Sequence, residues 1–233
     1  MTPELTFDIK ADALAAVWIA KSKEETRYYL NGVYITPWIS DGVPGVMIVA
    51  TDGYMLACYF DATGSASRPA IISGDFSATS LRTKAGERAP RRLECSGDIG
   101  RVKATPKRSN SPKPVALCLV AEIPGVFPAW EQIVPKAEVG EFGGRLFSWS
   151  HIVLSRVCQV SERLNGSREK AMDAFQKNKD APAFFTFGSG CPLMVVAMPM
   201  RGGDATVSVA TLNAAAEPLG SVDNRDTELL AAE

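Results

Sequence analysis

The 233-residue sequence lacks the residue patterns on which most enzyme sites depend. It has a single histidine, His151, and no GxSxG, GxxxxGK[ST] or HExxH motif. Its acidic residues are scattered without the paired spacing of a metal nuclease, and the GSG at 188–190 is too short for a phosphate loop. We therefore expect no enzymatic activity, no cofactor and no metal site. We interpret His151 as a partly buried or surface residue beside an apolar helical stripe.

Long apolar runs and closely spaced cysteines are also missing. No run reaches the ~18 residues of a membrane span, and residues 1–10 lack the basic and apolar pattern of a secretory signal. An odd number of isolated cysteines, with no CxxC pair, indicates buried and reduced thiols in a cytoplasmic protein without a membrane partner. The cysteines are Cys58, Cys95, Cys118, Cys158 and Cys191.

Charge is nearly balanced overall, at −1, but it is segregated along the chain. Residues 82–108 hold nine basic and three acidic residues, whereas the tail beyond Arg201 holds six acidic residues and only Arg225 as a base. Without that tail, 24 basic and 20 acidic residues remain. Such a body is compatible with a surface that faces phosphates. The length and the 46% hydrophobic content suffice for one large domain or two small ones.

Residues 26–58 carry the densest local signals of structure. Asn31-Gly32 and Asp52-Gly53 are turn dipeptides, and β-branched, aromatic or apolar runs lie on either side of them. This arrangement predicts consecutive antiparallel strands joined by tight turns. The predicted strands are 33–36, 46–50 and 54–60.

Elsewhere, alternation and apolar spacing predict further elements. Strands are expected at 5–9, 70–72, 91–95, 101–104, 115–121, 183–187 and 193–197. Helices are expected at 11–21, from a cap at Ser73 or Asp75 through Lys84, and along the stripe Leu146, Trp149, Val153, Val157 and Val160. Residues 161–180 also have helical propensity, and 61–69 and 105–114 read as loops. The order of strand, helix and several strands occurs twice, which indicates an internal repeat of pattern.

Four short blocks stand in a definite order: RYYLNG at 27–32, VATDGYMLA at 49–57, FPAWEQIVPK at 127–136 and VAMPMR at 196–201. In this order and at about this spacing they resemble the bacterial DNA polymerase III beta sliding clamp family, in a truncated and divergent form of phage or prophage type. The first two blocks match the family's middle domain, and the third matches the segment linking its middle and last domains. The fourth matches the end of its last domain.

The resemblance implies an α+β fold of the DNA-clamp type, with repeated βαβββ units and helices on one face of antiparallel sheets. It divides the chain into a full clamp-like domain at 1–135, a half domain at 136–201 and a disordered acidic tail at 202–233. The family's first domain has no counterpart, so the usual ring of two three-domain chains is not expected. Three half-units per chain would require four chains to supply the twelve of a family ring, so we expect a homo-tetramer.

In the family, partner proteins insert a short peptide with apolar anchors into a groove between the middle and last domains. Met55 stands where the family usually has a basic residue, which predicts a more apolar rim and an altered peptide preference. The alternative is that the matching residues are ordinary core, and for Leu56 and Val196 both interpretations carry equal weight. The matching positions are Leu30, Thr51, Gly53, Tyr54, Leu56, Pro135, Val196, Met198, Pro199, Met200 and Arg201.

The family's second surface is the inner wall of the ring, where Lys and Arg on helices attract duplex phosphates without reading sequence. For any single residue a solvated surface charge is the more frequent role, so only a cluster on one face would support DNA binding. The candidates are Lys21, Lys23, Arg82, Lys84, Arg88, Arg156, Arg163 and Arg168.

The resemblance thus predicts a non-catalytic processivity factor. It would encircle double-stranded DNA as an oligomer and bind peptide motifs of a DNA polymerase and a clamp loader. The alternative is a clamp mimic that forms no ring and binds the partner peptides as an adaptor, or as a competitor encoded by a mobile element. An enzyme on a borrowed fold would require a buried polar cluster in a cleft. The acidic tail could fold over the groove or the basic face as a self-inhibitor.

Overall fold

A computed structural model describes residues 4–134, 150–165, 172–176, 181–188 and 191–199. The chain divides into two compact units, Met1–Met200 and Arg201–Glu233, and all described residues belong to the first. The predicted division at residue 135 stays a prediction. The predicted disorder of the tail, and Leu146 and Trp149 of the helical stripe, lie outside the described residues.

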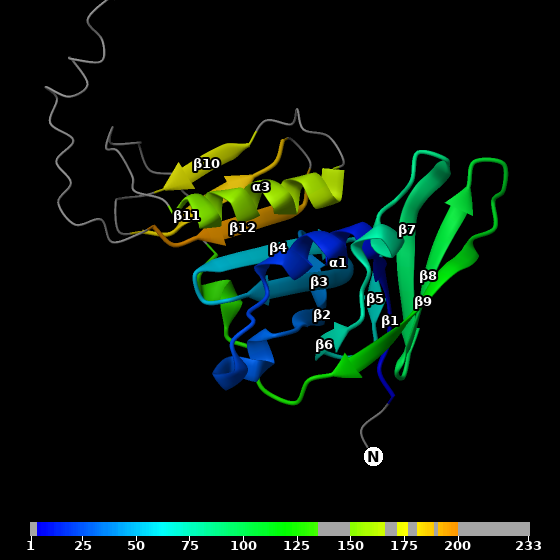
Figure 1. The fold of residues 1–233 in the computed structure, drawn as a ribbon, viewed down its shortest axis with the longest axis horizontal. Helices are drawn as coiled ribbons and strands as arrows, with labels where there is room; N and C mark the ends of the chain where they lie inside the picture. The colour runs from blue at the N-terminus through cyan, green and yellow to red at the C-terminus, as the bar shows by residue number, and fades with distance from the viewer. Residues whose placement is uncertain (1–3, 135–149, 166–171, 177–180, 189–190, 200–233) are drawn as a thin grey trace, which may run out of the picture. The chain divides into compact units, whose positions relative to one another are not determined.

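The chain up to residue 122 runs twice through the order strand, helix, several strands (Figure 1). The first pass contains β1 (Thr6–Lys10), α1 (Ala11–Val17), the 3-10 helices η1 (Trp18–Ala20) and η2 (Glu25–Leu30), β2 (Val33–Ser40), β3 (Val43–Thr51) and β4 (Met55–Asp61). The short β5 (Ser65–Ala66) precedes the second pass. That pass contains β6 (Ala70–Gly74), α2 (Ala78–Leu81), β7 (Glu87–Ser96), β8 (Ile99–Pro106) and β9 (Lys113–Glu122). The predicted repeat and the α+β class are therefore confirmed.

Further elements follow beyond η3 (Trp130–Gln132). They are α3 (His151–Asn165), β10 (Asp173–Gln176), β11 (Ala183–Thr186) and β12 (Leu193–Ala197). The strands of the described ranges join one antiparallel twelve-stranded sheet in the order β10-β11-β12-β4-β3-β2-β6-β9-β8-β7-β1-β5. The two passes meet where β2 pairs with β6, from Val33↔Ile72 to Ile35↔Ala70, and where β1 pairs with β7.

Two expected helices differ from the structure. The helix expected from residue 73 or 75 through Lys84 is a single turn, α2, because the expected capping group is used elsewhere. The Asp75 carboxylate accepts a hydrogen bond from the backbone N–H of Leu119 on β9 at 2.8 Å, and no side chain caps α2. Residues 161–180 were expected to be helical, but Asp173–Gln176 form β10, because pairing with β11 outweighs their local helical preference.

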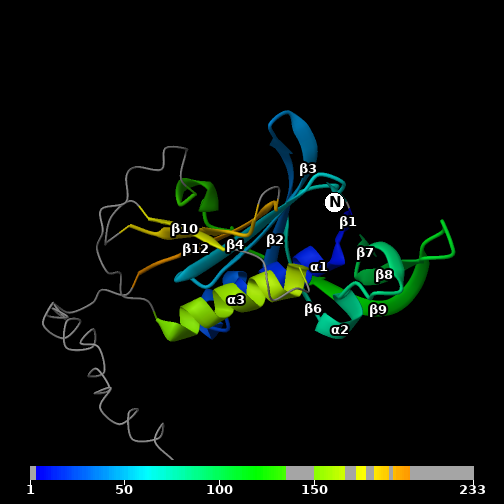
Figure 2. The same cartoon turned by 90° about the horizontal axis from the view of Figure 1, so that it is seen from above.

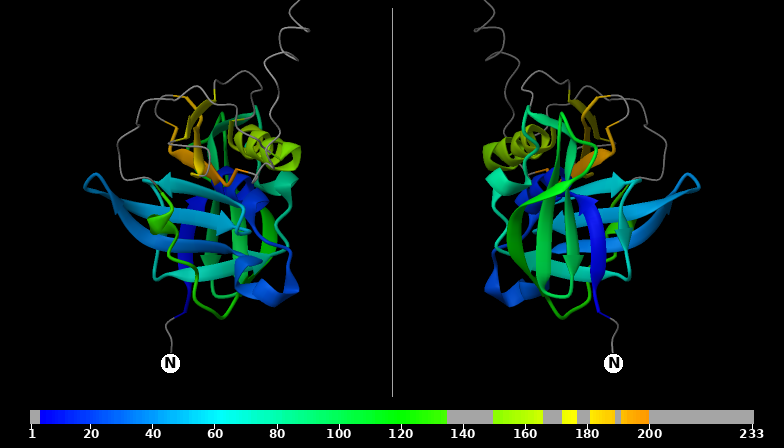
Figure 3. Two further views of the ribbon diagram at one scale, coloured as in Figure 1. Left: turned by 90° about the vertical axis from the view of Figure 1, so that its left-hand side faces the viewer. Right: turned by 90° about the vertical axis from the view of Figure 1, so that its right-hand side faces the viewer.

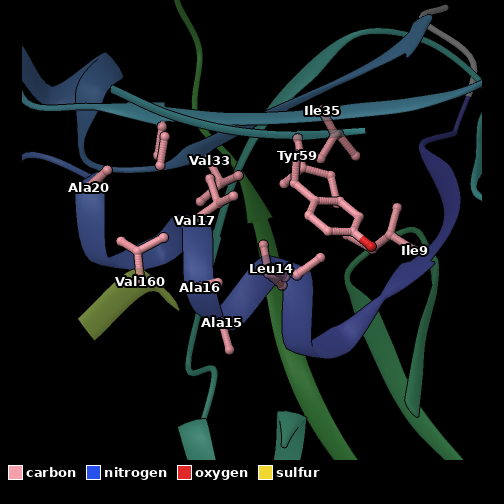
Figure 4. Close-up of a cluster of buried hydrophobic side chains, with 14 of the residues drawn as sticks. Ile9, Leu14, Ala15, Ala16, Val17, Ala20, Val33, Ile35, Tyr59 and Val160 are labelled. Carbon is pink, nitrogen blue, oxygen red and sulfur yellow. The ribbon is translucent and has the colours of Figure 1, made fainter. Parts of the chain in front are cut away.

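The principal core lies between the helices and one face of the sheet (Figure 2). Every residue of α1 except Asp12 is buried, and Leu14 and Val17 point toward Val33 and Ile35 of β2 (Figure 4). α3 packs beside α1, and its Val157 and Val160 are fully buried in the same core. Figure 3 shows α3 end-on over the strands, with the β2–β3 hairpin reaching beyond them.

A second apolar cluster covers the opposite face of the same strands. Side chains alternate between the two faces of a strand, so Met55 and Ala57 of β4 enter the principal core while Leu56 and Cys58 point the other way. β4 is therefore buried on both faces, which explains its continuous apolar sequence. We call this second group the outer cluster; it comprises Leu30, Val49, Leu56, Cys58, Ile71, Phe127, Trp130 and Val196.

Candidate functional site

Three predicted groove residues come from distant parts of the chain and meet in the outer cluster. β12 pairs antiparallel with β4, and this register places Val196 opposite Leu56. Leu30, at the end of η2, joins them. All three side chains are at most 3% exposed, so in this structure they are packed inside the outer cluster. We call these three residues the apolar floor.

The turn before β4 is held by side-chain hydrogen bonds. Thr51 Oγ1 accepts from the N–H of Gly53 at 3.0 Å and donates to the carbonyl of Met55 at 2.8 Å. Asp52 Oδ1 accepts from the N–H groups of Tyr54 and Met55, each at 2.9 Å. Gly53 has φ +92°, and a Cβ there would lie 2.8 Å from Arg27 Nη1. The positive φ therefore favours glycine at this position, whereas the contact is with the end of a flexible arginine side chain that could move aside.

More exposed groove residues border this floor. Tyr54 is 64% exposed and Met198 is 42% exposed, and the Met198 N–H donates to the Tyr54 carbonyl at 2.9 Å. Pro199 is half-buried. An exposed methionine and an exposed tyrosine beside an apolar floor are well suited to an apolar peptide anchor. Pro135, Met200 and Arg201 lie outside the described residues.

The segment after β9 contributes two aromatic residues that the sequence did not assign to the groove. Phe127 stacks on Tyr34 with ring centroids 4.9 Å apart, and Trp130 packs on Trp38 at 5.4 Å. Trp130 is 4% exposed, and its Nε1–H finds no acceptor among the described residues. Two aromatic residues in a proline-bracketed segment were the available signal. Their partners on β2 could be identified only from the strand register.

Three predicted DNA-facing residues border one cavity of about 610 Å³ on the helix side, namely Lys21, Lys23 and Arg156. Burial, and to a lesser extent repulsion from Lys23, lowers the pKa of Lys21. Lys21 Nζ also lies 4.9 Å from the centre of the Trp18 ring. Asp52 and Tyr54 border the same cavity, so this cavity adjoins the turn described above.

Four other predicted DNA-facing residues border a second cavity of about 390 Å³: Arg82, Lys84, Arg88 and Arg163. Asp12 and Glu87 also line it, but Glu87 is paired with Arg91 at 2.7 Å, so its charge is compensated. Seven of the eight predicted residues therefore fall into two groups at the helices. Arg168 lies outside the described residues.

Arg156 differs from the other six described candidates because its guanidinium forms an ion pair with a carboxylate of the protein. It forms an ion pair with Asp52 and donates from Nη2 to the Ile19 carbonyl at 2.8 Å. Lys21 is half-buried like Arg156, whereas five of the candidates are exposed: Lys23, Arg82, Lys84, Arg88 and Arg163.

Groups associated with catalysis or metal binding are sparse in the described part of the chain. No group of three His, Cys, Asp or Glu side chains there could hold a metal ion. His151 is exposed at the start of α3. No helix in the described ranges is long and apolar enough to cross a bilayer.

The five cysteines are free, as expected, but they are not uniformly buried. Cys58, Cys95 and Cys118 are buried, whereas Cys158 is exposed on α3, so the expectation of burial was wrong for this residue. It fails because Cys158 follows the fully buried Val157 on the helix and so points away from the core. Burial raises the pKa of Cys58 to about 12.

Comparisons with known proteins agree with this geometry. The sequence is 27% identical to the beta sliding clamp of Caulobacter vibrioides strain NA1000 / CB15N over 158 residues, which are 66% of this chain and 40% of the relative. The same identity and coverage hold for the clamp of strain ATCC 19089 / CIP 103742 / CB 15. No protein-family model matches. The resemblance to beta sliding clamps indicated by the four sequence blocks is therefore confirmed, and the chain spans less than half the length of these curated relatives.

Solved clamp structures share the fold at low sequence identity. The sliding clamp of Pseudomonas aeruginosa aligns with a TM-score of 0.52 at 15% identity, covering 87% of this chain and 68% of that chain. The clamp of Bacillus subtilis gives 0.51 at 13%, with coverages of 85% and 64%. The beta subunit of DNA polymerase III from Borrelia burgdorferi gives 0.53 at 12%, with 85% and 63%. The expected clamp-like arrangement is thus confirmed at the level of fold.

Proposed function

We propose that this chain, which has the fold of the beta sliding clamps, is a non-catalytic processivity factor of DNA replication in the cytoplasm. Several copies would enclose double-stranded DNA, and each copy would bind peptide motifs of a DNA polymerase and a clamp loader. The tether would be topological, so the protein would hold the polymerase near its template without contacting base edges.

The observation that carries this proposal is the pairing of β12 with β4. It unites Leu30, Leu56 and Val196 in one apolar floor and places Met198 and Tyr54 at its border. These are the positions at which the resemblance implies a peptide groove. Apolar side chains with a few polar groups at the rim suit a short peptide whose anchors are Leu, Met or Phe.

The basic residues support the DNA part of the proposal. Two cavities on the helix side collect seven of the predicted cations. Lys and Arg that face a duplex release counterions from its phosphates, which makes the affinity strongly dependent on salt and independent of sequence. We expect such a dependence for this chain.

Peptide binding tests the groove. A fluorescein-labelled decapeptide with Leu and Phe anchors would be titrated with the full chain, and its anisotropy measured. Met198→Glu should weaken binding about tenfold or more, because a carboxylate would be buried by the peptide. Met172→Glu is the matched control, since Met172, directly before β10, is a methionine of similar exposure, 40%. Equal binding by both variants would contradict a groove at Met198.

Ring formation needs a separate test. Light scattering would give the assembly mass, with the tetramer expected from counting half-units. Retention would be measured on linear duplex whose biotinylated ends are blocked by streptavidin after the protein is added. A ring should stay on the blocked duplex at high salt and be released by restriction cleavage. A monomer at all concentrations would exclude encirclement.

The second candidate function is a clamp mimic without a ring, which binds partner peptides as a competitor or adaptor. One feature favours it: the edge of β4 is covered by β12 of the same chain, so a second copy cannot pair there. A monomer that binds the decapeptide normally and is not retained on blocked DNA would support this alternative.

A further inference from the structure

We propose that Arg156 positions the peptide groove rather than contacting DNA. This inference rests on the proposed function, and it reassigns a residue that the resemblance placed on the DNA-facing wall. Arg156 lies on α3, and its side chain is 23% exposed. Its guanidinium joins two segments of the first pass: it pairs with Asp52 in the turn before β4, and it donates to the Ile19 carbonyl in η1 at 2.8 Å.

The Asp52 carboxylate links Arg156 to the backbone of the turn before β4. One of its oxygens, Oδ2, receives Arg156. The other, Oδ1, accepts from the N–H groups of Tyr54 and Met55, each at 2.9 Å. A carboxylate that is free to rotate could not keep both backbone bonds in this geometry. Because Arg156 fixes one oxygen, it also fixes the orientation of the other.

The turn at residues 52–55 also determines the positions of the border and the floor of the groove. The Tyr54 carbonyl accepts from the Met198 N–H at 2.9 Å, and Met55 begins the strand that sets Leu56 opposite Val196. A chain of named contacts therefore runs from α3 to the rim residues. Among the described residues, the polar partners of Arg156 are Asp52 and the Ile19 carbonyl, so its effect on peptide binding would be indirect.

Phosphate binding is a weaker role for Arg156 than for its neighbours. A phosphate would have to compete with the Asp52 carboxylate, whose side chain is only 16% exposed. Breaking a partly buried ion pair leaves the partner charge uncompensated. Lys23, in the same cavity, is exposed and can receive a phosphate at lower cost.

The test compares Arg156→Met, Arg156→Lys and Asp52→Asn in the full chain, with Arg163→Met as the control. Arg163 is an exposed arginine on the same helix that borders the other cavity. Amide hydrogen exchange of Tyr54 and Met55 would report the turn directly. Fluorescence anisotropy of the labelled decapeptide would measure binding to the groove. Anisotropy of a labelled 20-bp duplex would measure DNA binding.

We expect Arg156→Met to accelerate exchange at Tyr54 and Met55. Because its effect on the groove is indirect, it should weaken decapeptide binding only about three- to tenfold, the size expected for the net loss of one ordinary hydrogen bond. Arg156→Lys should restore part of both effects, and adding Asp52→Asn to Arg156→Met should add little more. Duplex affinity should fall less for Arg156→Met than for Arg163→Met. Unchanged exchange at the turn, or a duplex loss equal to that of Arg163→Met, would overturn the proposal.

Failure of the proposed function is distinguishable from failure of this inference. If the unsubstituted chain does not bind the decapeptide, the groove function fails. The exchange rates of Tyr54 and Met55 in Arg156→Met then decide by themselves whether Arg156 positions the turn.

Discussion

Asp61, at the end of β4, offers the sharpest test of what holds the two passes together. Its side chain is fully buried. It accepts hydrogen bonds from the Lys10 N–H at 2.8 Å, the Thr63 N–H at 3.1 Å, the Thr63 hydroxyl at 2.8 Å and Arg92 Nη1 at 3.0 Å. Arg92 lies on β7, so this carboxylate connects strands of both passes.

The magnitude of Asp61→Ala follows from the groups it leaves behind. Two backbone N–H groups lose their acceptor, at about 1–3 kcal/mol each. Arg92 keeps its ion pair with Asp8 at 2.8 Å, so the charge of Arg92 remains compensated. We therefore expect the free energy of unfolding to fall by about 3–5 kcal/mol, a large part of the ~5–15 kcal/mol typical of a domain. Asp61→Asn keeps one acceptor oxygen and should cost about 1–3 kcal/mol.

Urea denaturation followed by tryptophan fluorescence measures these changes. Asp41→Asn is the control, since Asp41 is an exposed residue of the β2–β3 turn, and it should change the free energy by less than about 0.5 kcal/mol. A loss below about 1 kcal/mol for Asp61→Ala would refute the argument that this buried carboxylate links the passes.

Three further predictions concern the surface and the thiols. The double substitution Lys21→Glu and Lys23→Glu should weaken binding to a 20-bp duplex. It should also reduce the slope of log K against log salt concentration by about 1.8, since two phosphate contacts are lost. The control, Arg101→Glu on β8, should leave this slope unchanged. The pKa of Cys58 is raised from 9.0 to about 12, so its contribution to stability is complete below pH 9 and is lost between about pH 9 and 12. In urea titrations, Cys58→Ala should lose less of its free energy of unfolding between about pH 9 and 12 than the unsubstituted protein. Equal losses would contradict a raised pKa for Cys58. Native protein should react with a thiol reagent at Cys158 first, and labelling of Cys58 at the same rate would disprove its burial.

Local patterns predicted most strands, because each strand is an apolar or alternating run between turn residues. Asp52-Gly53 correctly marked the turn between β3 and β4, whereas Asn31-Gly32 connects the 3-10 helix η2 to β2 and does not join two strands. Local patterns failed where a distant group decided the outcome. Asp75 looked like a helix cap but serves the N–H of Leu119, and no local signal identifies a partner 44 residues away.

The candidate site was predictable only in part for the same reason. The resemblance named Leu56 and Val196, but it did not reveal that Trp130 and Phe127 pack into the same outer cluster. It also placed Arg156 among the DNA-facing residues, because composition shows a charge and not its partner. Only the packing of α3 against η1 and the Asp52 turn reveals that partner.

The pairing of β12 with β4 has a consequence for synthesis of the chain. The two strands are brought together over 136 residues, the separation of Cys58 and Met194. At ~5–20 residues per second, a ribosome needs about 7–27 s to make the intervening chain. Throughout that time β4 has an unpaired edge on the emerging polypeptide, which is a template for wrong pairing with other strands. The nascent protein should therefore depend on a chaperone that shields β4 until β12 has been made.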